Sequence, residues 1–401
     1  MRLSCGPCAD DSDNVRVVLS RLLMMRRLRT FIVLLCASCI VAVAWAGHEL
    51  PIYPSFYPHQ IDIQTLPPEQ APAALTDVKL HAFIGRGVRF PGTLPNAVGT
   101  IDSLGAYIMV RVNPQASFAH KEALLCAATK TVIRAVAKGD VVLHPYPVTP
   151  FHGDYLYHID LAEAEKAKVT GAPDGPPIGD LKIKASGSIA QSHREWLATG
   201  ADWDLEVFEV NAADLVAAAT HATNGWIAPP WVKTGWFHAE RLLADAISDP
   251  EQKERGDTDV QRLMNGDFND LVERVNLERD LVTALTSGCH VVVVGYTIKH
   301  EYFNDEFSAG IENISYDSIT GLDSPMFLRT VKLKDYPWNG WLGLGIDAAP
   351  TAAWNPIGGM TDPFGRLMWA AIGDPALIPA PNDDGWMLNR IADLPANQRS
   401  K

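Results

Sequence analysis

Five potential metal ligands lie within 17 residues of one another, in the densest polar cluster of the sequence: His144, His152, Asp154, His158 and Asp160. Imidazole and carboxylate groups together suit a borderline cation such as zinc. We expect Tyr155–Asp160 to form a strand, which would direct His158 and Asp160 to the same face. Because the spacing matches no named metal motif, loop histidines and ordinary ion pairs are the alternative. No other cofactor is evident, so a divalent metal is the one cofactor considered.

Two groups of carboxylates offer a different chemistry. Asp202, Asp204 and Glu206 form the first group, which shares one face of an expected strand over residues 203–210. Asp305 and Glu306 form the second group, about 100 residues later. Two carboxylates about 5 to 10 Å apart can hydrolyse a glycosidic bond. Carboxylates combined with backbone oxygens can instead bind calcium. The alternative in an acidic protein is a solvated strand face.

Aromatic residues in irregular segments indicate a ligand-binding surface. Of the eleven tryptophans, ten lie between residues 196 and 386. Five of these belong to segments rich in Pro or Gly: Trp226, Trp231, Trp236, Trp338 and Trp341. Flat rings on loops offer a large contact area at low entropic cost, and they stack on sugars and other planar ligands. The alternative is that they pack in the core of a helical layer.

Motifs of the common enzyme classes are missing from the chain after residue 46. It contains no G-x-S-x-G, H-E-x-x-H, phosphate loop or haem-attachment sequence. A glycine pair at Gly85 and Gly87 follows a short strand, but Pro91 comes where the helix of a dinucleotide site must begin. The sequence therefore favours a protein without catalysis, while leaving the question of an enzyme open.

The N-terminal segment reads as an export signal. Three arginines between residues 26 and 29 precede an apolar run, Phe31–Val43, and the small residues Ala44 and Ala46 flank Trp45. This order is typical of a secretory signal cleaved near Ala46, which predicts a periplasmic or secreted protein. An uncleaved membrane anchor is the alternative, although the apolar run is shorter than the roughly 20 residues of a spanning helix.

Charge and cysteine content restrict the partners. The chain has a formal net charge of −13, and the leader carries six arginines and three aspartates, so its removal makes the rest more acidic. Nucleic acid is therefore excluded as a partner, and anionic membrane surfaces are disfavoured. Cys126 and Cys289 are the only cysteines after the leader. They could form one disulfide in an oxidising compartment, or remain two buried thiols.

Helix and strand patterns alternate along the chain. A helix is expected over residues 117–138 before a strand at 140–144, and another over residues 267–286 before a strand at 291–294. In the second helix, Asp270, Arg274 and Glu278 form an i,i+4 charge ladder that we expect on the solvent side. Further helices are expected at 211–222, 237–247, 364–372 and near Trp386.

These patterns predict a mixed α/β fold, α+β or α/β, with helices covering a mixed sheet and a helix-rich C-terminal half. A Gly- and Pro-rich segment at 169–179 is the expected hinge between two lobes. The predicted domains are the leader 1–46, an extended arm 47–75, a first α/β lobe 76–170 and a second, Trp-rich lobe 180–401.

Three functions agree with these features. The favoured one is an exported periplasmic ligand-binding or accessory protein, with a small molecule or sugar held between the lobes against the tryptophans. The second is an envelope polysaccharide hydrolase that uses a carboxylate pair. The third is a structural subunit of an envelope complex, in which the arm contacts a protein partner.

Overall fold

The computed structural model describes residues 58–171, 175–192, 202–223, 227–247, 249–335, 340–351, 360, 362–373 and 375–389. The predicted leader with its cleavage near Ala46, the start of the arm, Trp226 and Trp338 lie outside the described residues. The described residues all belong to one compact unit. None of their helices combines the length and the apolar character that crossing a membrane requires.

A mixed sheet is the centre of the structure. Within the described part of the chain it has eight strands, in the order β1-β10-β2-β7-β3-β6-β5, with β4 paired to β7. The two outer pairs on one side and β5 with β6 on the other are parallel, while the central strands pair antiparallel. The strands are β1 (Gln60–Thr65), β2 (Ala82–Ile84), β3 (Val98–Val112), β4 (Val142–Leu143), β5 (Ile183–Ala185), β6 (Leu205–Asn211), β7 (Val291–Asn304) and β10 (Trp341–Ile346).

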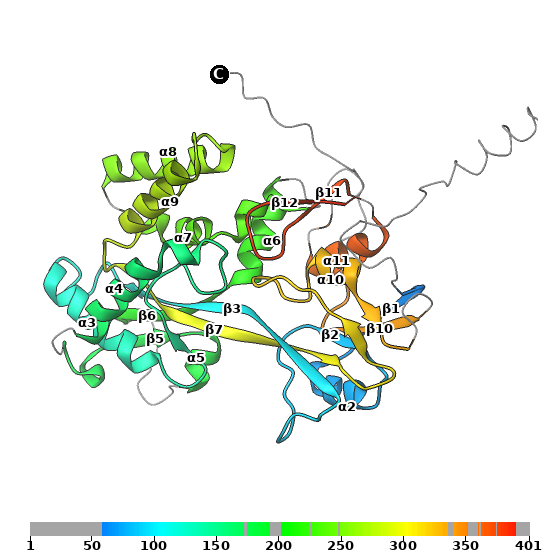
Figure 1. The fold of residues 1–401 in the computed structure, drawn as a ribbon. Helices are drawn as coiled ribbons and strands as arrows, with labels where there is room; N and C mark the ends of the chain where they lie inside the picture. Colours follow the sequence, from blue (N-terminus) through cyan, green and yellow to red (C-terminus); the bar gives the residue numbers. More distant parts are fainter. Residues whose placement is uncertain are drawn as a thin grey trace, which may run out of the picture. The chain divides into compact units, whose positions relative to one another are not determined.

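The longest pairing joins β3 to β7. Its register runs from Val98 opposite Asn304 to Arg111 opposite Val291, with irregularities between residues 104 and 109 of β3. At the first irregularity, the Ala106 amide donates a hydrogen bond to Thr297 Oγ1 at 3.0 Å. Figure 1 shows the two strands side by side, with α3 (Glu122–Val136) near one end and α2 (Ala71–Thr76) near the other.

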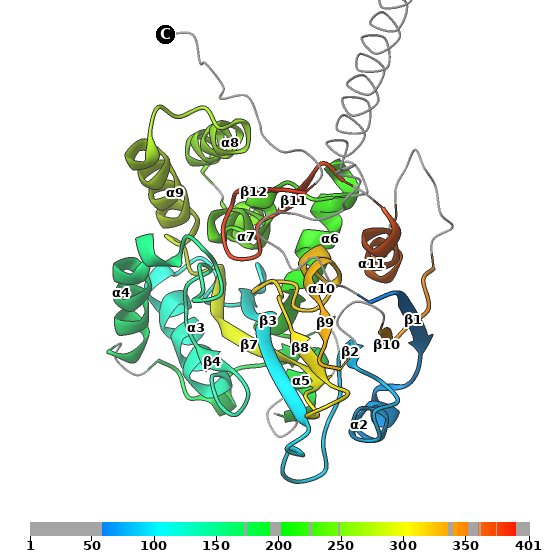
Figure 2. The same cartoon turned by 45° about the vertical axis from the view of Figure 1, so that its right-hand side comes forward.

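Alternate side chains of β3 enter two different cores, because successive residues of a strand point to opposite faces. Tyr107 and Met109 pack with a layer of four helices, while Ile108 and Val110 pack against α3 and α5 (Gly187–Ser192). The four helices are α6 (Ala212–Thr223), α7 (Gly235–Leu243), α8 (Pro250–Asn265) and α9 (Leu271–Leu285). Figure 2 shows α8 and α9 side by side. Helices therefore cover the sheet, and the predicted mixed α/β class is confirmed.

The opposite end of the sheet carries its own cores. Ile101 of β3 packs with α10 (Pro325–Thr330) and α11 (Pro363–Ile372), whereas Val98 packs with α2. The described residues also form two small antiparallel sheets of two strands each, β8 (Ile311–Asn313) with β9 (Lys332–Leu333), and β11 (Leu377–Pro379) with β12 (Trp386–Leu388). The main sheet thus unites strands from both predicted lobes, and the lobe boundaries stay a prediction.

Several expected elements are confirmed, among them α9, whose N-cap Asp270 accepts a hydrogen bond from the Glu273 amide at 2.9 Å. Two are wrong. Residues 155–157 form a 3-10 helix and α4 (Ile159–Thr170) follows, because the sequence LAEAEKAK after residue 160 consists of strong helix formers. The segment at Trp386 is a strand, because the turn after β11 returns the chain to pair with it.

The cysteine question is answered by a disulfide between Cys126 of α3 and Cys289, which precedes β7. The two residues are separated by 163 positions in the sequence, and their Cα atoms lie 5.2 Å apart. A cross-link of this span restricts the unfolded chain strongly. It also fixes α3 against the start of the central strand.

Replacing both cysteines with serine should lower the free energy of unfolding by about 2–5 kcal/mol, because the unfolded chain regains the entropy that the long loop had lost. Urea unfolding of the oxidised protein and of the double variant measures the difference. Reduced wild-type protein is the matched control and should unfold with the variant. Identical midpoints for the oxidised protein and the variant would show that the bond does not stabilise the fold.

Candidate functional site

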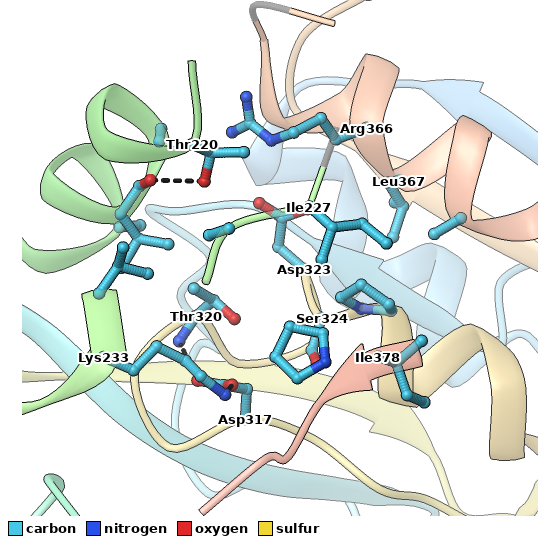
Figure 3. A pocket seen from close by; sticks show the side chains of 18 of the residues that line it. Thr220, Ile227, Lys233, Asp317, Thr320, Asp323, Ser324, Arg366, Leu367 and Ile378 are labelled. Carbon is cyan, nitrogen blue, oxygen red and sulfur yellow. Dashed lines mark hydrogen bonds and ion pairs between the residues drawn. The ribbon is translucent and has the colours of Figure 1, made fainter. Parts of the chain in front are cut away.

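A cavity between α6, α10, α11 and β11 is the candidate ligand site. Its free volume is about 90 Å³. This is below the roughly 300–1,000 Å³ of sites for drug-sized ligands, so the cavity suits only a small ligand. Its walls are largely apolar, with Val216, Ile227, Leu367 and Ile378 from four separate segments. Figure 3 shows these segments around the cavity.

Two opposite charges line this cavity without pairing to each other. Asp323 lies directly before the N-cap of α10, and Arg366 lies in the second turn of α11. Among the described residues, Asp323 accepts no hydrogen bond, and Arg366 makes only a long one, of 3.4 Å, to the Met360 carbonyl. Figure 3 shows both side chains at the cavity. A ligand could therefore reach a free carboxylate and a free guanidinium.

Burial raises the pKa of Asp323 to about 7, and the charges of Lys299 and Arg366 oppose that rise. Burial also lowers the pKa of Arg366. A guanidinium nevertheless stays charged in proteins, so the carboxyl is the one that titrates. The cavity therefore holds a permanent cation and an acid that changes charge near neutral pH.

A second pair of charges on the wall is already satisfied. Lys233 Nζ lies 2.6 Å from Asp317 Oδ2, and both side chains are buried. Lys233 also donates to the Ala380 carbonyl, while Asp317 accepts hydrogen bonds from the amides of Ile319 and Thr320. A buried ion pair with all its partners is best assigned a structural role.

A polar network lies in the core beneath the helical layer. Tyr107 Oη is 3.1 Å from His152 Nε2 and 2.9 Å from His238 Nδ1, and the two imidazoles are 3.2 Å apart. His238 Nε2 donates to the Val232 carbonyl at 3.0 Å. Burial lowers the pKa of His152 to about 3, so the imidazole is neutral. Three elements that are distant in sequence are thus held by one hydroxyl.

A second buried cluster joins two of the predicted metal ligands to a residue that the sequence pattern did not suggest. Asp154, His158 and Glu278 each have a potential ligand atom within 4.8 Å of those of the other two. All three residues are buried, with Glu278 and His158 at 0% exposure. Burial first, and then the charge of Asp154, raise the pKa of Glu278 to about 8. Glu278 was expected on the solvent side of α9, and that expectation is wrong.

The other predicted metal ligands lie apart from this cluster. His144 Nε2 makes a 2.8 Å hydrogen bond with the Val148 carbonyl. His152 belongs to the Tyr107 network. Asp160 is directed outward from the start of α4 and forms a paired contact with Arg279, at 2.7 Å for both oxygens. Its exposure follows from the helix that replaces the expected strand.

The five carboxylates considered for hydrolysis fall into two separate places. Asp202, Asp204 and Glu206 lie at the start of β6, which pairs with the Val112 end of β3, whereas Asp305 and Glu306 follow the residue paired with Val98. Each has a local partner. These are Lys182 for Asp202 and for Asp204, Arg111 and Lys184 for Glu206, Lys334 for Asp305, and the amides of Ser308 and Ala309 for Glu306.

The described tryptophans of the predicted binding surface do not line the cavity. Trp231 and Trp236 pack together in the core of the helical layer, with ring centroids 6.2 Å apart. Trp341 lies on β10 with 65% of its surface exposed. Trp226 and Trp338 lie outside the described residues. Trp369 of α11, which was not singled out, does line the cavity.

Comparison with models of protein families gave no match, and comparison with curated proteins gave none either. Solved structures do resemble the chain. One is the periplasmic EDTA-binding protein EppA, with 11% identity and a TM-score of 0.36 over 63% of this chain and 54% of that one. Another is NikZ from Campylobacter jejuni in complex with Ni(L-His), with 14% identity and a TM-score of 0.33 over 62% of this chain and 56% of that one. A third is the oligopeptide-binding protein AppA from Bacillus subtilis in complex with a nonapeptide, with 11% identity and a TM-score of 0.36 over 64% of this chain and 57% of that one. The chain thus aligns with little more than half the length of these binding proteins.

Replacing Tyr107 with phenylalanine should lower the free energy of unfolding by about 1–3 kcal/mol, because it removes the hydroxyl that two buried imidazoles share. Denaturant unfolding measures the change. Tyr157→Phe is the matched control, since Tyr157 is 39% exposed and should tolerate the substitution. Equal midpoints for the two variants would contradict a stabilising role for the network.

Proposed function

We propose that the chain is an exported solute-binding protein that holds a small zwitterion, such as an amino acid, in the cavity lined by Asp323 and Arg366. The observation that carries the proposal is that Asp323 and Arg366 line one cavity and form no ion pair with each other within the described residues. Arg329 and the paired Lys233 and Asp317 line the same cavity. Burying an ionised group without a partner costs free energy, so a ligand that supplies both missing partners gains by binding there.

Each charge selects one group of the ligand. A carboxylate at Asp323 would accept hydrogen bonds from an ammonium group, while the planar guanidinium of Arg366 can bind a carboxylate with two parallel hydrogen bonds. The apolar walls from Val216, Ile227 and Ile378 would contact the part of the ligand that joins its two charges. A ligand with only one of the charges would leave one protein group without a partner, which disfavours it.

Two features support export. The sequence of residues 26–46 has the order of a secretory signal, and the Cys126–Cys289 disulfide is typical of proteins that fold outside the reducing cytosol. An exported chain with a ligand cavity and no catalytic motif would bind its ligand outside the cytosol. A periplasmic or secreted location therefore fits the proposed role.

A thermal-shift screen with amino acids, short peptides, simple amines and simple carboxylates tests the proposal. Zwitterions should raise the melting temperature more than amines or carboxylates alone, because a ligand that binds only the folded state stabilises it. Asp323→Asn should abolish the shift. Asp62→Asn, which changes an exposed aspartate of β1, should leave it intact.

No shift with any zwitterion, or an equal shift in the Asp323→Asn protein, would contradict the proposed site. A shift produced only by sugars or other neutral solutes would point to a different ligand class. Calorimetric titration of any compound that stabilises the protein gives the stoichiometry, which binding in this cavity alone predicts to be one.

The affinity for the ammonium group should increase with pH. Asp323 has a pKa of about 7 in the folded protein, so its carboxylate form increases about tenfold between pH 6 and pH 8. Lys299 and Glu301 from β7, together with Arg366 and Asp362 at α11, are the charges that act on this carboxyl. Titration calorimetry at the two pH values measures the effect. A flat profile would mean that Asp323 does not bind the ligand.

A further inference from the structure

The cluster of Asp154, His158 and Glu278 contains polar atoms that the protein leaves without partners. His158 Nε2 and both carboxylate oxygens of Glu278 are buried and make no hydrogen bond within the described part of the chain. Glu278 Oε1 lies 3.1 Å from Arg274 Nε, which is an ion-pair distance, but Glu278 Oε2 has no counterpart. Buried polar atoms are nearly always satisfied, so these atoms require an explanation.

The imidazole of His158 is bonded through one nitrogen only. Its Nδ1 lies 2.8 Å from the hydroxyl of Tyr146, and its Nε2 has no partner within the described residues. Burial raises the pKa of Tyr146, so the phenol keeps its proton. A hydroxyl oxygen that accepts from Nδ1–H leaves the lone pair on Nε2 for a cation. Histidine ligands of metals are usually oriented in this way by a second residue.

The carboxylate of Asp154 is fixed by backbone amides. The Gly235 amide, at the start of α7, lies 3.0 Å and 2.9 Å from its two oxygens. The N-terminus of a helix favours a negative charge. The start of α7 therefore holds Asp154 in place, and this element differs from those that carry His158 and Glu278. Such a preformed arrangement is what a metal site needs.

Arg274 is a cation next to the cluster, and it pairs with Glu278 and also with Asp384. These contacts leave His158 Nε2 and Glu278 Oε2 without a partner in the described part of the chain. A divalent cation held between the three side chains would pair these orphaned atoms.

We infer that Asp154, His158 and Glu278 bind one divalent cation of the zinc type. Zinc accepts imidazole nitrogen and carboxylate oxygen at about 2.0–2.2 Å, and three protein ligands leave a fourth position for water. The present separations, up to 4.8 Å, would close as the side chains move onto the ion. One nitrogen and two carboxylates also suit manganese, whereas calcium prefers six or more oxygen ligands.

A route for the ion exists on the side of Asp154. This residue and Arg274 line a small pocket that is bounded by the turn between β11 and β12. Asp383 and Asp384 lie on that turn and line the same pocket. Acidic side chains at an opening attract cations to it. The site is thus buried but not sealed.

Zinc binding to the full chain, first stripped with a chelator, tests the inference. Titration calorimetry and elemental analysis should give one zinc per chain, with a rise in melting temperature. Glu278→Gln and His158→Gln should each weaken zinc binding by at least about tenfold, since both remove a ligand. Manganese and calcium serve as comparison ions, and calcium should bind more weakly than zinc.

Two controls separate lost ligands from lost folding. Glu278→Gln keeps the shape of the side chain but gives up the ion pair with Arg274, so the metal-free variant should melt somewhat below the wild type while still unfolding in one cooperative transition. Its zinc affinity is compared on that folded material. Asp160→Asn changes a carboxylate two residues from His158 that contacts Arg279 instead, and it should bind zinc as the wild type does. Failure of the wild type to take up one zinc, or undiminished zinc affinity in the two glutamine variants, would overturn the inference.

Discussion

The pairing of β3 with β7 is the constraint on which the rest of the structure depends. These two long strands lie next to each other in the middle of the sheet, and each hydrophobic core of the described residues contains side chains from at least one of them. The irregularity near residues 104–107 lets one strand serve two pairs of cores, because a bulge changes the direction in which side chains point. The buried acid cluster includes Glu278 of α9, which precedes β7, and the cavity is lined in part by α6, which follows β6, the strand paired with β3.

The two candidate sites share one structural support. Lys233 lines the cavity with Asp323 and also the pocket that leads to Asp154. Its pairing with Asp317 holds the segment before α7 against the loop before α10. Because that pair is fully satisfied, the wall between the two sites is expected to be rigid. The unsatisfied groups lie on either side of it, where a ligand or an ion can reach them.

The sequence predicted the elements whose pattern is local. The helix of α9, the strand that begins at Val291 and the fold class follow from apolar periodicity and capping residues, which neighbours in the chain determine. Composition was informative too, since two cysteines after a predicted export signal made a disulfide one of two alternatives, and the structure contains it. The strand predicted over Tyr155–Asp160 is wrong, because the prediction rested on His158 and Asp160 and not on the helix-forming residues that follow them.

The sites themselves depend on contacts that no local pattern encodes. Asp154 and His158 were singled out, but Glu278 looks like a member of a solvent-side charge ladder and becomes buried only because α9 packs against the loop that carries Asp154. Asp323 and Arg366 have no distinctive neighbours in the sequence, and only the meeting of α10 with α11 gives them a shared cavity. Trp231 and Trp236 pack in the core, because large aromatic rings fill cores as readily as they line sites, and the predicted aromatic surface stays a prediction.

Native-state hydrogen exchange of the β3 and β7 amides is the most direct measurement of whether this strand pair holds the molecule together as one body. If it does, the amides of residues 98–104 and 107–112 exchange equally slowly, through global unfolding. Markedly faster exchange on one side of the irregularity would show that the two ends of the sheet open separately, and it would contradict a single continuous support for both sites.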